Sequence, residues 1–242
     1  MDSKNPNVEV FNRDVSAHGG YQYTKVDRLS CRLATQRTTD LILETNCFAG
    51  RSVLDMGCGD GYYTLRFWDL GKPRSMVAVD GAERAIEHAE ASKNGRPIRF
   101  EVGDAHRLPY PDNSFDLVLV QSILHHDDDP EDMIREAFRL APQIVIHEPN
   151  GNNLGLKVVE KLSTYHRLHG EKSYSSRQLR LWVEAQGGRV TYQRFAGFVP
   201  MFCPDWVARA TKAFEPFLER MPPLNAWGCA IMVLVAQRRE TR

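Results

Sequence analysis

The segment SVLDMGCGDGYYT, residues Ser52–Thr64, constrains the fold more than any other stretch of the sequence. Its first residues form a short apolar run that predicts a buried strand, and Gly57, Gly59 and Gly61 then predict a tight loop. Because glycine has no Cβ, such a loop can adopt positive φ and let a ligand lie against the backbone. The residues after the loop suit a helix, whose N-terminus supplies free N–H donors. The segment therefore predicts a strand–loop–helix unit that binds a ligand, with the Asp55 carboxylate beside it.

Three further apolar runs follow this segment, and each ends in a polar side chain. They are Val77–Asp80 (VAVD), Phe100–Asp104 (FEVGD) and Phe115–Gln121 (FDLVLVQ). In doubly wound α/β folds, an acid about 20 residues beyond the glycine loop reaches a ribose hydroxyl, and Asp80 has this spacing. Polar groups at the carboxyl ends of parallel strands converge on one crevice. We therefore expect these side chains to surround one ligand.

These motifs resemble the class I S-adenosylmethionine-dependent methyltransferases, of the small-molecule, type 11-like kind. The resemblance is carried by DMGCGDG, VAVD, VGDAHRLPYPDNSFDLVLVQSILHH and IVIHEPN, which cover about Val53–Asn150 in the expected order. It implies an α/β fold with a doubly wound, seven-stranded, mostly parallel, Rossmann-like sheet, whose seventh strand lies between the fifth and sixth. A dinucleotide dehydrogenase would more often show GxGxxG, so the glycine spacing favours the methyl donor.

The resemblance also implies roles for the residues at the strand ends. Gly57–Gly61 would lie along the methionine part of S-adenosylmethionine, with Asp55 near its amine. Asp80 would bind the ribose hydroxyls, and the Gln121 backbone would approach the methionine end. Asp104 and Ala105 would meet the adenine edge. The expected donor-binding residues are Asp55, Gly57, Cys58, Gly59, Gly61, Asp80, Gly81, Asp104, Ala105 and Gln121.

Composition excludes several other classes of protein. The 31 basic and 31 acidic residues balance, which removes the main electrostatic reason to expect nucleic-acid binding. The sequence has no run of ~18 apolar residues and a polar N-terminus, so we expect neither a membrane span nor a signal peptide. Its 5 cysteines are odd in number and lack CxxC spacing, which is typical of reduced thiols in a cytoplasmic protein.

Candidate catalytic residues follow the fourth run and lie at the end of a fifth, Gln143–Asn150 (QIVIHEPN). His125 and His126 precede three aspartates, but adjacent residues seldom bind one ion, so we expect no metal site. The aspartates instead suit the N-terminus of a helix over 130–141. His147 and Glu148 leave the fifth run at the same edge of the sheet, where they could orient an acceptor or carry a proton. The alternative for these residues is local packing or capping.

Two further groups could contact the acceptor. Tyr165, His166, His169 and Tyr174 belong to the densest group of proton-transfer side chains in the sequence, at the end of a helix expected over 153–170. They form a candidate acceptor lid, although histidines in a helix tail are also stabilised by the helix dipole. Tyr21 and Tyr23 could touch donor or acceptor, or could anchor their segment on the core.

The expected organisation is a single domain over 1–242, with an N-terminal helical cap (1–50), a donor-binding core (51–150) and an acceptor lid with the closing antiparallel strands (151–242). The segment 196–227 is rich in aromatic residues and prolines and longer than a hairpin requires. It could cover the acceptor pocket, which would suit a ring-bearing or apolar acceptor. It could equally form a satellite core or a dimer contact.

The sequence therefore predicts methyl transfer to an oxygen, nitrogen or carbon nucleophile of a small molecule. A base among His125, His126, His147, His166 and His169 would take the proton where the acceptor carries one, because histidine titrates near neutral pH. The alternatives are a non-catalytic scaffold or sensor that binds S-adenosylmethionine and a nucleotide-dependent oxidoreductase. The sequence leaves the oligomeric state open, a homodimer included.

Overall fold

A computed structural model describes residues 8–9, 12–13, 15, 20–24, 26–162 and 172–239. These residues form a seven-stranded sheet in the order β3-β2-β1-β4-β5-β7-β6. All neighbouring strands run parallel except β7, which is antiparallel to β5 and β6. The strands are β1 (Ser52–Met56), β2 (Ser75–Asp80), β3 (Ile98–Val102), β4 (Leu117–Gln121), β5 (Gln143–Pro149), β6 (Gly188–Ala196) and β7 (Ile231–Arg238).

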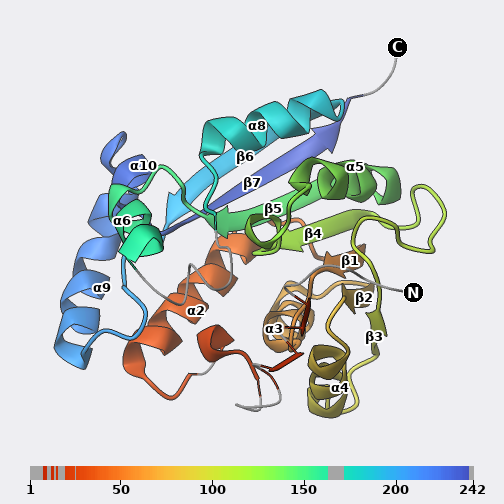
Figure 1. Ribbon diagram of the computed structural model, residues 1–242, viewed down its shortest axis with the longest axis horizontal. Helices are drawn as coiled ribbons and strands as arrows, with labels where there is room; N and C mark the ends of the chain where they lie inside the picture. The colour runs from red at the N-terminus through yellow and green to blue at the C-terminus, as the bar shows by residue number, and fades with distance from the viewer. Residues whose placement is uncertain are drawn as a thin grey trace.

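Helices cover both faces of the sheet (Figure 1). The α-helices are α2 (Leu29–Leu43), α3 (Tyr62–Gly71), α4 (Glu83–Ser92), α5 (Pro130–Leu140), α6 (Leu154–Leu162), α8 (Ser176–Ala185), α9 (Asp205–Glu219) and α10 (Leu224–Gly228). Short 3₁₀ turns occur at η1 (Gln22–Thr24) and η2 (Leu124–His126). Side chains of α2, α3 and α4 share one apolar core, and those of α5 and α8 share the core on the opposite face.

The central strands read as continuous apolar runs because both of their faces are buried. All five residues of β4 are buried, and so are the middle five of β5. Within β5, Ile144 and Ile146 pack on the α5 side, whereas Val145 packs on the α2–α3 side. The strand alternation therefore sends Glu148 to the α5 face and His147 to the α3 face at the end of β5.

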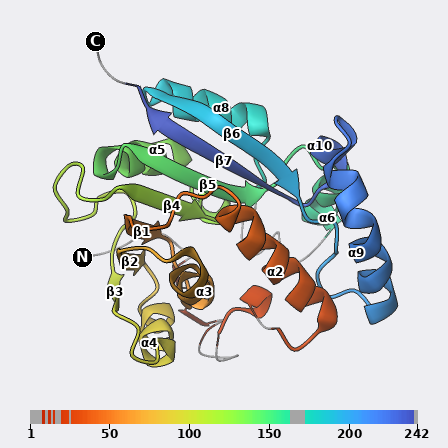
Figure 2. The same cartoon turned by 180° about the vertical axis from the view of Figure 1, so that it is seen from behind.

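The carboxyl ends of the parallel strands form one edge of the sheet, and α6, α9 and α10 gather at this edge. Helix α6 follows β5, and α9 and α10 lie between β6 and β7. Both views show these three helices together at one end of the molecule, with α9 beside α2 (Figures 1 and 2). The side chains at this edge thus come from segments far apart in the sequence.

The predicted sheet, including the position of β7 between β5 and β6, is confirmed. Two strand boundaries differ from the predicted runs. Strand β3 ends at Val102, two residues before Asp104, and the Gly103 N–H makes one further hydrogen bond to β2, to the Asp80 carbonyl at 3.0 Å. Strand β4 begins at Leu117, because the Phe115 N–H donates to the Leu140 carbonyl at 3.1 Å instead of joining the sheet.

Candidate active site

The glycine loop after β1 uses the backbone conformations that its sequence predicts. Gly57, Gly59 and Gly61 have φ of 81°, 56° and 79°, the left-handed region that favours glycine. A Cβ on Gly59 would lie 2.5 Å from the Tyr21 ring, and one on Gly57 would lie 2.5 Å from the Ile123 side chain. The loop is thus packed between residues from the N-terminal segment and from the end of β4, with no room for larger residues.

Asp80 ends β2 beside this loop and is held by two backbone amides. Its carboxylate accepts hydrogen bonds from Gly59 N–H and Ala82 N–H, both at 2.8 Å. Burial raises the pKa of Asp80, and the backbone hydrogen bonds partly oppose that shift. A carboxylate has about four lone-pair sites, so this side chain retains capacity to accept from ribose hydroxyls. Gly81 follows it, close to the Gly103 carbonyl.

Asp55, on β1, is 1 % exposed and points to the α3 face. Thr64 on α3 donates its hydroxyl to one Asp55 oxygen at 2.6 Å, and the other oxygen is buried without a hydrogen-bond partner among the described residues. Burial raises the pKa of Asp55 to about 7, and the nearby Asp80 adds to the effect. A buried, unpaired carboxylate oxygen of this kind fits the amine of S-adenosylmethionine, because a cation there would supply the missing donor.

We expect Asp55 to make the protein less stable as the pH rises from about 4 to about 7. The folded state holds the Asp55 proton up to about pH 7, whereas the unfolded chain releases it near 3.8. Between these values the folded state binds more protons, so the free energy of unfolding falls with rising pH. In urea unfolding at several pH values, the free energy of unfolding should fall less with rising pH for Asp55→Asn than for the wild type. Equal pH dependence in the two proteins would contradict the buried, protonated carboxyl.

The segment 20–24 lies over the glycine loop. Asp60, within the loop, accepts the Tyr21 N–H at 3.0 Å and the Thr24 hydroxyl at 2.6 Å. Tyr23 contacts Phe202 edge to face, with ring centroids 5.5 Å apart. Tyr21 thus touches the donor loop, while Tyr23 touches the segment before α9. The sequence did not single out Asp60, since its partners lie more than 30 residues away.

The rim at the ends of β4 and β5 contains a histidine–carboxylate pair. His125 Nδ1 lies 2.6 Å from Glu148 Oε2, and both side chains are buried. The other oxygen of Glu148 accepts the Ile123 and Leu124 N–H groups at 3.1 and 2.9 Å. Glu148 is therefore fixed from both sides and in turn fixes His125. The His126 ring lies against the His125 ring, with centroids 3.9 Å apart.

His147 and Gln121 are opposite each other on β5 and β4 and are both buried. His147 Nδ1 lies 3.2 Å from the Ser122 hydroxyl, and Nε2 has no hydrogen-bond partner among the described residues. Burial lowers the pKa of His147 to about 3, and the neighbouring His125 adds to the effect. His147 is thus a neutral hydrogen-bonding group at neutral pH and a weak base. Glu148 pairs with His125 and not with its sequence neighbour His147.

The loop after β3 contains the expected adenine contacts. Asp104 accepts the His106 N–H at 2.9 Å, and Ala105 packs against the core on the α5 side. His106 lies between two carboxylates, with Asp127 at 3.1 Å and Asp132 at 3.2 Å. This loop is therefore tied to the segment that carries His125. The sequence did not indicate His106, because its partners belong to another loop and to α5.

The remaining expected site residues are Cys58 in the glycine loop and the group of histidines and tyrosines between residues 165 and 174. Burial raises the pKa of the Cys58 thiol well above its ordinary value, so Cys58 stays protonated inside the glycine loop. Tyr174 is half-buried and contacts Trp182 edge to face, with ring centroids 4.6 Å apart. Burial and the carboxylates of Glu148, Asp127 and Asp128 raise its pKa, which keeps the phenol neutral. Tyr165, His166 and His169 lie outside the described residues.

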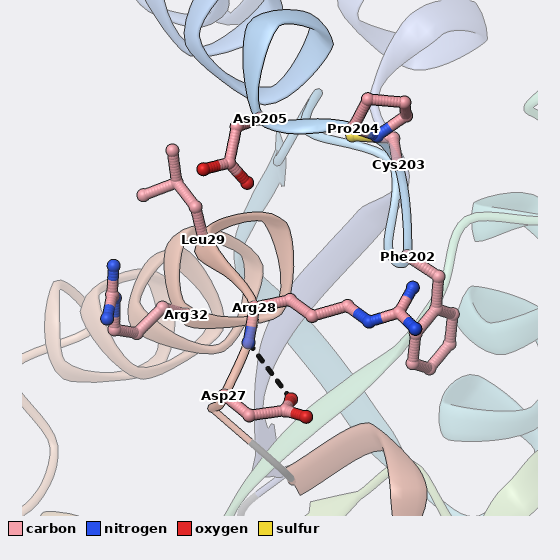
Figure 3. A pocket seen from close by; sticks show the side chains of 8 residues that line it. All are labelled: Asp27, Arg28, Leu29, Arg32, Phe202, Cys203, Pro204 and Asp205. Atoms are coloured by element: carbon pink, nitrogen blue, oxygen red, sulfur yellow. Dashed lines mark hydrogen bonds between the residues drawn. The ribbon is translucent and has the colours of Figure 1, made fainter.

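A pocket of about 460 Å³ opens where the N-terminus of α2 meets the segment before α9 (Figure 3). Arg28 and Leu29 line it from α2, and Phe202 and Asp205 line it from the other side. The Arg28 side chain extends toward the Phe202 ring (Figure 3). Phe202 also touches Tyr23, so the segment 20–24 contacts both a wall of this pocket and the glycine loop. It is partly apolar and contains charges of both signs.

Within the described residues, no helix is both long enough and apolar enough to cross a membrane.

Residues 54–143 match the protein family described as "Methyltransferase domain". One relative is the uncharacterized methyltransferase YcgJ of Bacillus subtilis, 32% identical over 106 residues, or 43% of this chain and 41% of YcgJ. Another is the 27-O-demethylrifamycin SV methyltransferase of Amycolatopsis mediterranei, 36% identical over 111 residues, or 44% of this chain and 41% of the relative. The chain thus spans about two fifths of the length of these relatives.

The fold is also similar to that of solved proteins. The [4+2]-cyclase SpnF covers 97% of this chain, and this chain covers 93% of SpnF, with a TM-score of 0.67 and 21% identity. At this identity the likeness concerns the fold. The buried carboxylate of Asp55, the amide-bound Asp80 and the glycine loop fit the methyl donor that the sequence predicts. The match to the methyltransferase domain covers residues 54–143, and the seven-stranded sheet has the strand order that the resemblance to class I S-adenosylmethionine-dependent methyltransferases implies.

Proposed function

We propose that the protein transfers the methyl group of S-adenosylmethionine to an oxygen, nitrogen or carbon nucleophile of a small molecule with a ring or another apolar part. The observation that carries this proposal is the pair formed by His125 of η2 and Glu148 of β5, next to the glycine loop. Ile123, two residues before His125, packs on Gly57, so the pair and the loop are neighbours. A histidine oriented by a buried carboxylate is a typical general base.

The protein's main contribution would be to position donor and acceptor. S-adenosylmethionine, when bound, supplies a methyl carbon that is already electrophilic, so alignment is the larger task for the protein. The glycine loop, Asp55 and Asp80 would hold the donor, and the η2 segment would present the acceptor. Alignment of this kind supplies up to about 7–11 kcal/mol in well-oriented systems.

His125 would remove the acceptor's proton. With Nδ1–H directed to the Glu148 carboxylate, Nε2 is the basic nitrogen of the neutral ring. Glu148 also stabilises the cation that forms when Nε2 takes a proton, because their charges are opposite. His147, with its pKa lowered to about 3, is a poor candidate for this step. His126 stays a prediction, and so do His166 and His169, which lie outside the described residues.

The acceptor would enter between the segment after residue 150 and the cap expected over residues 1–50. Three observations support this route. Lys172 N–H donates to the His125 carbonyl at 3.3 Å, which brings the segment before α8 against the histidine pair. Phe202 lines the pocket and contacts Tyr23. An acceptor with an apolar ring would suit the Leu29 and Phe202 walls, and the relative named for 27-O-demethylrifamycin SV acts, by its name, at an oxygen of a small molecule.

The test is a turnover assay on the purified chain with S-adenosylmethionine and a panel of small phenols, alcohols and amines, read as S-adenosylhomocysteine by mass spectrometry. We expect acceptor-dependent product with at least one apolar acceptor class. Because SpnF has this fold and is named a cyclase, donor binding is measured separately by calorimetry. Donor binding without transfer to any acceptor would favour the scaffold or sensor, and binding of NAD(H) but not S-adenosylhomocysteine would favour the oxidoreductase.

A further inference from the structure

Helix α9 has its polar and apolar sides reversed relative to an ordinary surface helix. Its buried side carries the acids Glu215 and Glu219, which are 3 % and 9 % exposed. Its outer side carries Trp206, Phe214 and Phe217, which are 74 %, 59 % and 58 % exposed. A surface helix normally directs its apolar stripe to the core. The outward aromatic stripe is therefore not explained by packing within this protein.

The buried acids explain why α9 has this orientation. Glu219 accepts two hydrogen bonds from Arg37 of α2, at 2.7 and 2.8 Å, and one from Gly197 N–H at 3.0 Å. Glu215 accepts the Phe198 N–H at 2.9 Å and pairs with Lys212. These contacts fix the rotation of α9 about its axis. The aromatic side chains are consequently held outward, in one fixed arrangement.

The apolar surface continues from α9 onto its two neighbours. Helix α10 packs against both α9 and α6, and both views show the three helices at one end of the molecule (Figures 1 and 2). The exposed large apolar residues of these helices define what we call the α9 face: Leu154, Val158, Trp206, Phe214, Phe217, Leu224 and Trp227. Contiguous exposed apolar residues of this kind mark an interaction surface.

The charges on this face favour an anionic occupant. The exposed charged side chains of α9 and its C-cap are Asp205, Arg209 and Arg220. Within the described part of the chain, no ion pair involves Arg209 or Arg220. Arg28 and Arg32 are exposed beside the N-terminus of α9. A second copy of the chain docked on this face would bring these arginines together with few exposed acids to balance them, which disfavours self-association.

We propose that the α9 face binds the surface of a membrane that contains anionic lipids, with α9 lying in the plane of the interface. Tryptophan, phenylalanine and arginine are the residue types that interfacial helices use, the rings reaching the acyl boundary and the cations reaching the headgroups. At 1.5 Å per residue, the aromatic stripe from Trp206 to Phe217 is about 17 Å long. The pocket lined by Arg28 and Phe202 opens at the N-terminal end of that stripe. The protein thus binds the membrane peripherally, through side chains.

The test is vesicle co-sedimentation of the full chain. We expect binding to vesicles of mixed phosphatidylcholine and phosphatidylglycerol, weakened by salt, and much less binding to pure phosphatidylcholine. The triple variant Trp206→Ser, Phe214→Ser, Phe217→Ser should lose binding about tenfold or more, and Arg209→Glu with Arg220→Glu should lose the preference for phosphatidylglycerol. The matched control is Leu70→Ser with Leu181→Ser, which removes exposed apolar residues from other surfaces and should bind as the wild type.

Thermal unfolding and donor calorimetry show whether each variant remains folded, since none of these residues contacts the glycine loop. Three outcomes would overturn the proposal. They are no vesicle binding by the wild type, undiminished binding by the folded triple variant, and equal binding to neutral and anionic vesicles at all salt concentrations. Light scattering tests whether a second copy of the chain occupies the α9 face instead. A dimeric wild type and a monomeric triple variant, with no vesicle binding by the wild type, would assign the face to a second copy.

Discussion

We expect the His125→Gln variant to transfer methyl groups about 10²–10⁴-fold more slowly than the wild type, with its donor affinity unchanged. Glutamine occupies similar space but cannot accept a proton at neutral pH. The donor loop contacts Ile123 rather than His125, so donor binding should not change. Single-turnover kinetics with a hydroxyl or amine acceptor, together with calorimetry of S-adenosylhomocysteine, separates the two quantities.

The acceptor provides the control for this prediction. An acceptor that is already a good nucleophile, such as a thiolate, needs no base, so His125→Gln should slow its methylation much less. Glu148→Gln should lower kcat as well, because it leaves His125 without its negative partner. A His125→Gln variant with wild-type kcat on hydroxyl and amine acceptors would remove His125 from the base role.

We expect the Arg37→Met variant to lose about 3–5 kcal/mol of unfolding free energy, because it removes the main cation from a buried carboxylate and leaves only the longer contact with Arg194, at 3.3 Å. Arg37 donates to both oxygens of Glu219 and also to Glu44 at 2.9 Å. Burial alone would raise the pKa of Glu219, but the bonds from Arg37 and Gly197 outweigh it and lower that pKa. Removing the Arg37 guanidinium therefore leaves the burial of Glu219 opposed only by Arg194 and the Gly197 N–H. Urea unfolding near neutral pH gives the free energy directly.

The exposed pair Arg74–Asp116 is the matched control, since its N–O distance of 3.1 Å is similar but both side chains are largely solvated. Arg74→Met should cost at most about 1 kcal/mol. The double variant Arg37→Met, Glu219→Gln should recover part of the loss, because it removes the unpaired charge. Equal losses for Arg37→Met and Arg74→Met would show that the α2–α9 connection contributes little.

The features that the sequence predicts well are those set by neighbouring residues. The glycine loop and the position of Asp80 follow from short apolar runs and glycine spacing, whereas the order of the strands follows from the family resemblance. The helix N-caps also follow locally: the Ser175 hydroxyl accepts the Gln178 N–H at 3.1 Å, and the Asn153 side chain accepts the Leu156 N–H at 3.1 Å.

The pairings within the site could not be predicted, because their partners are distant in the sequence. Glu148 follows His147 directly, yet its hydrogen-bond partner is His125, 23 residues earlier. The reason is strand alternation, which sends adjacent residues of β5 to opposite faces. Asp60 likewise reaches Tyr21, 39 residues before it. A sequence pattern gives the residue types at the rim but not the pairs they form.

In the segment 196–227, the orientation of a whole helix also depends on a partner that is distant in the sequence. Its aromatic residues suggested a cover for the acceptor pocket, a satellite core or a dimer contact. Phe202 does line a pocket, but Trp206, Phe214 and Phe217 face solvent. The cause is Glu219, whose partner Arg37 lies 182 residues away and fixes the rotation of α9. Helical spacing alone does not show which side of α9 meets the core.

The central claim is that the glycine loop and Asp80 hold the adenosyl donor, and calorimetric titration with S-adenosylhomocysteine tests it most directly. We expect one site in the wild type and an affinity lower by about tenfold or more in both Asp80→Ala and Gly59→Val. Gly95→Val is the matched control, because Gly95 has φ of +73° but open space around it. Its affinity should equal that of the wild type. Wild-type affinity in folded Asp80→Ala and Gly59→Val, or no binding by the wild type, would contradict the claim.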